Sequence, residues 1–214
     1  MAGRRPLSRT EERQLLRIAR KLKPRDRALV TTQWFTGFRI HEVLALTVGH
    51  VFRDGQIVPR IGVAPRHLKG GYGNTRWIPV LPELSRALRR HLWWLRLKFQ
   101  VTPDFPLFPS RQADHEGRVR PMSRSRAYRM IKKTFARARI RDDGRLGTHS
   151  LRKTWAAHVY HNAGCDLMVL KNALGHADVN STQRYLEVDE DKVMAAIAHC
   201  DFTRIPRKQP TVAA

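Results

Sequence analysis

The sequence predicts a mainly α-helical fold with a small antiparallel three-stranded sheet, an α+β arrangement. Apolar residues recur at helical spacing over most of the chain. Strand-like runs occur only between residues 51 and 80. The hydrophobic fraction of 42% and the five Trp favour a folded core over a disordered chain. These observations together predict one helical domain with a minor sheet.

The N-terminal part of the chain carries the signals of three successive helices. Ser8 and Glu11 have the spacing of a capping box, so the first helix begins there. Pro24 starts the second helix, because proline is favoured at the first helical position. Gly37 is expected to end that helix, and a short helix resumes over residues 39–46.

The next part of the chain is typical of strands. Residues 51–53 and 56–58 flank Asp54-Gly55, a pair typical of hairpin turns. Residues 76–80 are expected to form the third strand, after the glycine-rich segment 69–74. We expect these three strands to make one small sheet that lies outside the core of the fold.

Helices are expected over most of the remaining chain. Leucines recur at helical spacing between Pro82 and Lys98, so we expect Trp93 and Trp94 to belong to the core. A loop rich in Pro and Gly follows. Further helices are predicted over residues 123–140, 150–163, 166–174, 178–186 and 189–199. Residues 1–200 are thus predicted to form one domain, and residues 201–214 a disordered tail.

The charge of the chain indicates a polyanionic partner. It has 41 Lys and Arg residues against 18 Asp and Glu residues, a net charge of +23. Nucleic acid is the leading candidate, because each neutralised phosphate releases a condensed counterion. An anionic membrane would require a concentrated basic amphipathic segment or a lipidation signal. Because the basic residues run along the whole chain, we expect double-stranded DNA as the partner and no membrane.

Cysteine usage and hydropathy indicate the compartment. Cys165 and Cys200 form no close pair, which fits a reducing compartment and argues against a disulfide framework. The sequence contains no signal peptide and no run of roughly 20 apolar residues. We therefore expect a cytoplasmic, nucleoid-associated protein of bacterial or phage origin.

The C-terminal third concentrates residues that suit chemistry at a phosphodiester. His149 and Arg152 lie three positions apart at a predicted helix start, so both side chains can face one point. His176 and Tyr185 follow. Tyr is a poor nucleophile at its free pKa of about 10, so it needs a proton acceptor or a cationic field. Fixed cations around the nonbridging oxygens would lower the barrier as negative charge increases at phosphorus.

The same residues also have simpler interpretations. A lone His at a helix start is usually a cap or a surface residue, and a Tyr on an amphipathic helix usually belongs to the core. Their occurrence together, in order, favours the catalytic interpretation. The sequence has no acidic cluster that offers a metal site, so we expect neither metal nor cofactor. A phosphotyrosine intermediate would conserve bond energy, and rejoining would then need no ATP.

The two boxes of the tyrosine recombinases, also called phage-type integrases, resemble segments of this chain. Residues 36–46, with a Thr-Gly turn before Arg39 and with Glu42 after it, resemble the first box. The second box is similar to residues 149–154, residues 174–176 and Tyr185. Between them, Lys69 and the segment Arg76-Trp77-Ile78-Pro79 are similar to the family's hairpin Lys and its following Arg and Pro. The resemblance covers about residues 8–200.

The resemblance implies roles for these residues at the scissile phosphate. Arg39, Arg152 and His176 would hold the nonbridging oxygens. Glu42 would support Arg39 by a charge-assisted hydrogen bond, although a surface salt bridge is the simpler alternative.

The remaining roles concern proton transfer and the covalent link. Lys69 would protonate the 5′-oxygen leaving group. His149 would exchange a proton with Tyr185, which would form the 3′-phosphotyrosine link. Because the turn after Lys69 is longer than usual, Lys98 and Lys153 stand as alternatives for the general acid.

Two further departures from the family pattern are present. Gly49-His50 replaces the acidic residue that often follows the first box. Only 38 residues precede Arg39, where these enzymes usually carry an N-terminal core-binding domain. The chain is therefore either the catalytic part of a longer protein or a single-domain protein. Met1 and the short segment before the first predicted helix favour a single-domain protein, so we expect no core-binding domain.

The function implied is site-specific recombination that results in integration, excision or inversion. A type IB topoisomerase, which relaxes DNA by the same chemistry, is one alternative, and a noncatalytic DNA-binding accessory protein is another. We expect a monomer in free solution and a homotetramer on DNA. The predicted helix 189–199 starts with acidic residues and has an apolar side. It would dock on a neighbouring protomer or pack on its own domain.

Overall fold

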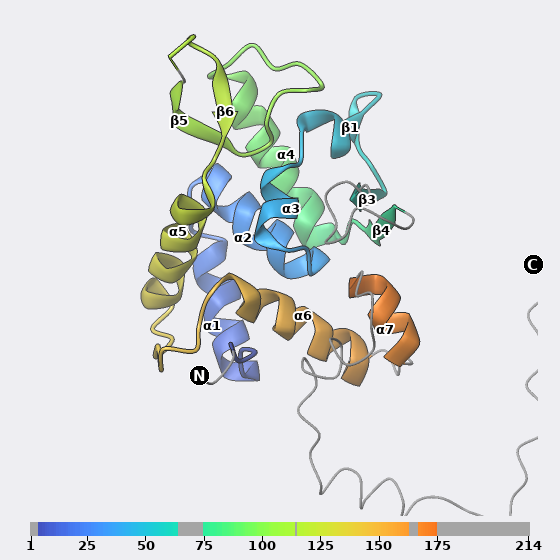
Figure 1. Ribbon diagram of the computed structural model, residues 1–214, viewed down its shortest axis with the longest axis vertical. Helices are drawn as coiled ribbons and strands as arrows, with labels where there is room; N and C mark the ends of the chain where they lie inside the picture. The colour runs from blue at the N-terminus through green and yellow to red at the C-terminus, as the bar shows by residue number, and fades with distance from the viewer. Residues whose placement is uncertain (1–3, 64–74, 114, 163–166, 175–214) are drawn as a thin grey trace, which may run out of the picture.

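The computed structural model describes residues 4–63, 75–113, 115–162 and 167–174 (Figure 1). The helices over these ranges are α1 (Arg9–Ala19), α2 (Pro24–Thr36), α3 (Ile40–Leu44), α4 (Pro82–Arg96), α5 (Arg124–Arg137), α6 (Thr148–Asn162) and α7 (Leu167–Leu174), with a 3-10 turn at Val48–His50. The strands are β1 (Phe52–Arg53), β2 (Gln56–Ile57), β3 (Arg60–Val63), β4 (Arg76–Pro79), β5 (Pro109–Ala113) and β6 (Val119–Pro121). The mainly helical architecture with small antiparallel sheets confirms the predicted fold class.

Helix α2 lies at the centre of the fold. It packs against α1, α3, α4 and α6, so residues on nearly all of its sides are buried. One continuous apolar core runs from Leu7 to Leu151. A smaller cluster joins α6 to α7 through Ala156, Leu170 and Leu174. Figure 1 shows β5 and β6 at one end of the molecule, with α6 and α7 toward the other.

The predicted helix boundaries in the N-terminal part are confirmed. The Ser8 hydroxyl accepts from the Glu11 amide, and the Glu11 carboxylate accepts from the Ser8 amide, which completes the capping box. Pro24 is the first residue of α2. Gly37 follows α2 with a φ of +63°, a left-handed conformation that favours glycine. A Cβ at this position would also overlap the ring of Trp155 on α6.

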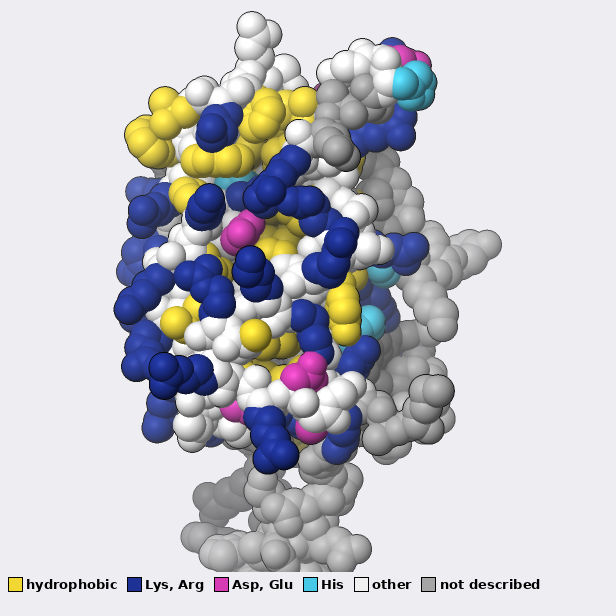
Figure 2. Space-filling view, turned by 90° about the vertical axis from the view of Figure 1, so that its left-hand side faces the viewer, with side chains coloured by type: hydrophobic (Ala, Val, Ile, Leu, Met, Phe, Trp, Pro, Cys, Tyr) yellow, Lys and Arg dark blue, Asp and Glu magenta, His cyan; other side chains and the backbone are white. Residues whose placement is uncertain are grey.

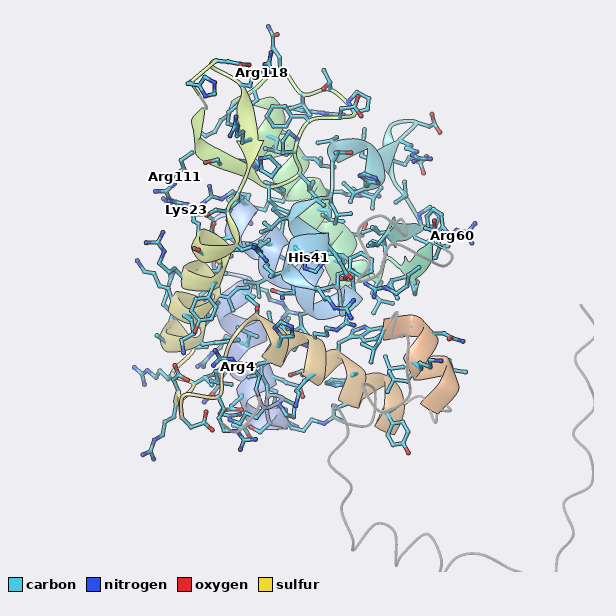
Figure 3. All side chains as sticks on the ribbon, viewed as in Figure 1. Arg4, Lys23, His41, Arg60, Arg111 and Arg118 are labelled. Atoms are coloured by element: carbon cyan, nitrogen blue, oxygen red, sulfur yellow. The ribbon has the colours of Figure 1, made fainter. Side chains whose placement is uncertain are left out.

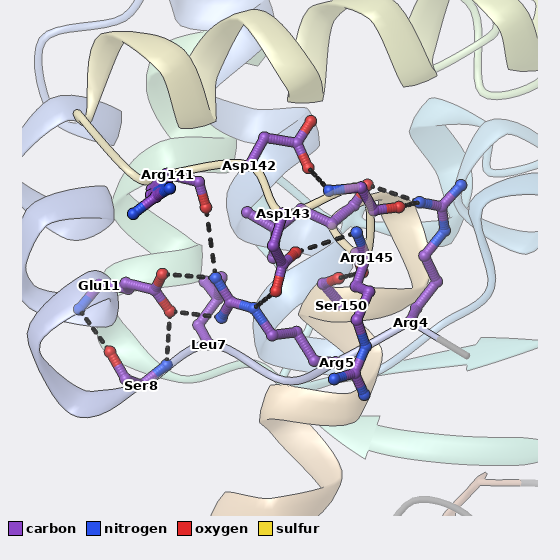
Figure 4. Close-up of polar contacts among 12 residues, drawn as sticks. Arg4, Arg5, Leu7, Ser8, Glu11, Arg141, Asp142, Asp143, Arg145 and Ser150 are labelled. Carbon is purple, nitrogen blue, oxygen red and sulfur yellow. Dashed lines mark hydrogen bonds and ion pairs between the residues drawn. The ribbon is translucent and has the colours of Figure 1, made fainter. Parts of the chain in front are cut away.

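The N-terminal segment is tied to the loop that leads into α6 (Figure 4). Arg5 donates to both carboxylate oxygens of Glu11, at 2.7 Å each, and to Asp143 at 2.9 Å. The amide of Leu7 donates to the hydroxyl of Thr154 on α6, at 2.8 Å. Residues at the start of the chain therefore hold α6 in place through polar contacts.

The predicted three-stranded sheet is wrong in its pairing. The hairpin β1–β2 is present, with Asp54 and Gly55 both at positive φ. Strand β4 pairs instead with β3, a strand that the sequence did not predict. Pro59 separates β2 from β3, and it has no amide proton for a ladder bond while its carbonyl accepts from Val80. The described residues thus form two-stranded sheets, and β5 with β6 lies where a loop was predicted.

The expectation for Trp93 is also wrong. Its side chain is 63% exposed, because the leucines of α4 face the core and Trp93 lies outside that stripe. Trp94 is partly buried and packs against the core, as predicted.

The helical predictions over the rest of the chain are confirmed as far as the structure describes them. Helix α5 lies within the predicted range 123–140, and α6 and α7 match the next two predicted helices within a few residues. The predicted helices 178–186 and 189–199, and the predicted tail 201–214, lie outside the described residues. Within the described part of the chain, no helix has the length and apolarity needed to cross a membrane.

Candidate catalytic site

Arg39 lies at the start of α3, directly after the turn that Gly37 makes. It is the residue before the first turn of α3, and its side chain is partly buried. The Arg39 amide donates to one oxygen of the Glu42 carboxylate at 2.6 Å, and Arg39 Nη1 donates to the other at 3.0 Å. Glu42 is 1% exposed. The predicted hydrogen bond between Glu42 and Arg39 is therefore present, and its acceptor is buried, so it is no surface salt bridge.

A second arginine completes the surroundings of Glu42. Arg76 on β4 donates from Nη2 to the Glu42 carboxylate at 2.7 Å. Its Nη1 donates to the backbone carbonyl of Leu174, the last residue of α7, at 2.5 Å. The guanidinium also lies over the ring of Phe38, 4.6 Å from the ring centroid. Arg76 thus connects α3, β4 and the end of α7.

Arg152 on α6 is fully buried and contacts both the turn before Arg39 and the end of α7. Its Nη1 donates to the carbonyl of Gly37 at 2.5 Å, and its Nη2 donates to the carbonyl of Leu174 at 2.6 Å. Burial of a guanidinium is costly unless its donors are satisfied, and here two backbone oxygens accept from its two terminal nitrogens. These two contacts bring the arginine of the second box to the turn before Arg39.

The charges around Glu42 keep it ionised. Burial alone would raise the pKa of Glu42, but the charge of Arg76, the hydrogen bond from the Arg39 amide and the charge of Arg152 outweigh burial and lower it. Burial lowers the pKa of Arg76, against the effect of Glu42, which raises it. The site is therefore a buried carboxylate surrounded by cations.

His149 lies in the first turn of α6, and its side chain is exposed at the edge of this cluster. Partial desolvation lowers its pKa first, followed by the positive charges of Arg152, Arg39, Arg4 and His41. Figure 3 labels Arg4, near the start of the chain, and His41, on α3. The imidazole is thus held neutral near pH 7, and a neutral imidazole can accept a proton.

The other predicted site residues lie outside the described residues. These are Lys69, His176 and Tyr185. Of the two alternatives for the general acid, Lys98 lies over the ring of Trp94, at 5.7 Å from its centroid. Lys153 follows Arg152 on α6 and is partly buried.

Sequence reasoning missed the part that Arg76 takes in this cluster. Arg76 and Ile78 lie two positions apart in the predicted strand 76–80, so their side chains share one side of it, and the structure buries that side. An arginine on the inward side of a strand requires a buried partner. That partner, Glu42, is 34 residues away in the sequence, and no local pattern connects the two.

A mainly helical fold brings Arg152 on α6 to the turn before Arg39, and solved structures share this fold. The crystal structure of the XerA recombinase matches 94% of this chain and 66% of its own, with a TM-score of 0.71 and 26% identity. The fold is that of the tyrosine recombinase catalytic domain. The XerH recombinase bound to its difH substrate shares this fold, with a TM-score of 0.66 and 22% identity over 91% of this chain and 54% of its own.

The sequence comparisons lead to the same family. The model of the phage integrase family matches residues 5–192, so the chain belongs to the phage integrase family. It is 32% identical over 197 residues to tyrosine recombinase XerC of Erythrobacter litoralis, which covers 91% of this chain and 57% of that relative. It is 29% identical to tyrosine recombinase XerA of Pyrococcus furiosus, over 92% of this chain and 63% of that relative. The chain thus spans about half to two thirds of the relatives that it matches.

Proposed function

We propose that this chain is the catalytic domain of a site-specific DNA recombinase, which cleaves and rejoins strands through a 3′-phosphotyrosine link at Tyr185. The observation that carries the proposal is the contact of Arg152 with the carbonyl of Gly37, two residues before Arg39. It brings one candidate phosphate-binding arginine to the turn that precedes the other. Membership of the phage integrase family supports the same conclusion.

Arg39, Arg152 and His176 would bind the nonbridging oxygens of the scissile phosphate. The two terminal nitrogens of Arg152 place its guanidinium between the turn before Arg39 and the end of α7. Such preorganised cations act on the charge that increases in the transition state.

His149 would take the proton of Tyr185, and Lys69 would give a proton to the 5′-oxygen. The lowered pKa of His149 supports the first role, since a histidine that is neutral at pH 7 is a competent base. The role of Lys69 rests on its position in the sequence alone, between the two boxes.

Double-stranded DNA is the proposed substrate, and the cytoplasm or nucleoid is the proposed location. Figure 2 shows Lys and Arg side chains spread over the face of the molecule that α1 and α5 form. Basic residues cluster near the start of α5. The pKa of Arg126 shows this crowding, because burial and then the positive charges of Arg111, Arg25 and Arg129 lower it. Such crowded cations gain from phosphate neutralisation, so we expect DNA binding to weaken steeply with salt.

We propose a monomer in free solution and a homotetramer on paired DNA sites, in which residues 189–199 of one copy dock on the next. We propose the groove between α1, α2 and α6 as the docking site of this segment. Leu16, Phe35 and Val159 give the groove an apolar lining, and the charged residues Arg9, Arg13 and Glu12 also line it, two cations against one anion. The docking helix would bring an apolar side and an acidic first turn, Asp189-Glu190-Asp191, of opposite charge to these arginines.

Covalent capture of DNA tests the proposed function. The wild-type protein is incubated with nicked duplexes of randomised sequence, in which the cleaved fragment diffuses away and traps the adduct. We expect an adduct with wild type and none with Tyr185→Phe, while binding of the selected duplex persists. Because the proposed cations are side chains, EDTA should leave adduct formation unchanged.

Covalent capture, together with a plasmid relaxation assay, distinguishes the alternatives. An adduct that persists in Tyr185→Phe would move the nucleophile to Tyr72, Tyr128 or Tyr160. Relaxation of supercoiled plasmid that lacks the selected sequence would favour a type IB topoisomerase. DNA binding without any adduct would favour an accessory protein.

A further inference from the structure

We propose that Arg76 is a positioning residue that holds Arg39 and Arg152 in one fixed geometry for cleavage. The inference rests on the proposed function, because it takes these two arginines as the groups that bind the scissile phosphate. Arg76 itself donates to groups other than these two arginines. Its two terminal nitrogens are directed at Glu42 and at the Leu174 carbonyl.

The first link of this arrangement runs to Arg39. Glu42 accepts from Arg39 through one carboxylate oxygen and from Arg76 through the other, and that second oxygen also accepts from the Arg39 amide. The carboxylate is therefore fixed from two sides. Its position fixes the Arg39 guanidinium, because a bond to each oxygen removes the rotation of the carboxylate.

The second link runs to Arg152. The carbonyl of Leu174 accepts from Arg76 at 2.5 Å and from Arg152 at 2.6 Å. One backbone oxygen at the end of α7 therefore accepts hydrogen bonds from two guanidinium groups. Since β4 also packs against α7, Arg76 keeps this oxygen in the place where Arg152 meets it.

The burial of Arg76 indicates a role that requires its charge. Its side chain is 4% exposed, and Ile78 fills the next inward position of the same strand. An apolar residue would pack there at lower cost, because a buried ion must recover its desolvation energy from its partners. The nearby charge of Arg39 also opposes the charge of Arg76 and helps to lower its pKa.

The chemical consequence concerns the charge that reaches the phosphate. With Arg76 in place, the negative charge of Glu42 is shared between two guanidinium groups. Without Arg76, Arg39 alone would balance the buried carboxylate and would lose part of its attraction for phosphate. Loss of Arg76 should therefore slow the chemical step more than it weakens DNA binding.

Single-turnover cleavage by the full chain tests the inference. The probe is the nicked duplex that wild type selects by covalent capture, made with either an ordinary scissile phosphate or a neutral methylphosphonate. Arg76→Met should slow cleavage of the phosphate by on the order of 100-fold, the size typical of losing one preorganised donor, with DNA affinity unchanged. On the methylphosphonate the difference from wild type should largely disappear, because less negative charge then needs stabilisation.

Matched variants separate positioning from folding. Arg60→Met, at an exposed position of the neighbouring strand β3, should cleave like wild type. Arg76→Lys keeps the charge but lacks the planar fork, so it should recover only part of the rate. If Arg76→Met does not fold, Arg76→Lys replaces it, measured alone and combined with Glu42→Gln. The losses of cleavage rate in the two single variants should not add in the double variant, since Arg76 acts through Glu42.

Two results would overturn the inference. One is a wild-type rate in a folded Arg76→Met or Arg76→Lys protein. The other is an equal loss on phosphate and methylphosphonate, which would make Arg76 a structural residue only. Failure of the proposed function is distinguishable, because wild type itself would then form no adduct.

Discussion

The guanidinium of Arg152 donates to the carbonyl of Gly37 at 2.5 Å, across 115 residues of sequence. This contact places the helix that carries His149 and Arg152 against the turn that precedes Arg39. The turn exists because Gly37 adopts a φ of +63°, which ends α2 and redirects the chain. A backbone feature of the first box thus supplies the acceptor for the catalytic candidate of the second box.

Substitution of Gly37 should therefore destabilise the protein strongly. Gly37→Ala adds the strain of a left-handed L-residue, roughly 1–2 kcal/mol, to an overlap with the ring of Trp155. Gly55→Ala is the matched control, since it has a φ of +76° but no atom within 4 Å of the added Cβ. Urea unfolding should show a clearly larger decrease in the free energy of unfolding for Gly37→Ala than for Gly55→Ala. Equal decreases would show that the overlap with Trp155 does not affect stability.

Removal of Arg39 should affect chemistry more than folding. Its side chain is 16% exposed, so Arg39→Ala also removes buried contacts, and the folded fraction is measured beside the rate. We expect cleavage of the captured duplex to fall by on the order of 100-fold or more, as for loss of one donor to a developing charge. Single-turnover rates and thermal unfolding measured on the same preparation provide the check. A loss of rate that tracks a loss of folded protein would contradict the catalytic role.

The acid stability of the protein should depend on Glu42. Its folded-state pKa is lowered below the ordinary value, so its stabilising contribution is present above that value and is lost as the pH falls through the folded pKa. At pH 7, Glu42→Gln should cost about 3 kcal/mol, because it leaves buried cations without their counterion. Below about pH 4.5 the difference from wild type should shrink.

Urea unfolding between pH 3 and pH 7 measures this dependence. Glu116→Gln, in the turn between β5 and β6, is the control, and its unfolding curve should follow wild type because exposed ion pairs contribute little. A constant difference between Glu42→Gln and wild type over the whole range would mean that Glu42 does not titrate differently on folding.

Lys69 should be needed only when the leaving group needs a proton. Lys69→Ala should be slow on an ordinary duplex and should recover on a duplex with sulfur at the 5′-bridging position, since a thiolate leaves without protonation. Lys98→Ala and Lys153→Ala are the comparison variants. Rescue of either of these in place of Lys69→Ala would move the general acid to that residue.

Assembly should depend on the segment beyond Leu186. A chain truncated after Leu186 should still bind one DNA site as a monomer and should fail to form the larger complex. Leu81→Asp tests the proposed groove, because Leu81 lines it and is 47% exposed. The new carboxylate would repel the acidic start of the docking helix, while Asp is a favoured cap for α4, whose N-terminus has no side-chain cap. Sedimentation with site DNA measures the size of the complex. An unchanged tetramer in the truncated chain would exclude a role for the segment beyond Leu186, and one in Leu81→Asp would exclude the groove.

The sequence by itself determined the features that depend on a few neighbouring residues. The capping box of Ser8 and Glu11, the start of α2 at Pro24 and the left-handed Gly37 all follow from hydrogen bonds and steric limits within one or two turns of chain. The motif order likewise selected Arg39, His149 and Arg152 as site candidates. The fold class and the family follow from such signals, because they recur along the whole chain.

Only the tertiary structure decided which distant segments meet. The pairing of β4 with β3 and the contacts of Arg76 with Glu42 and Leu174 join segments that no local pattern connects. A strand pattern shows which side of a strand is buried but leaves its partner open. A buried charge is tolerated only where another segment supplies its counterion, so the packing of the whole chain decides where an arginine such as Arg76 can lie.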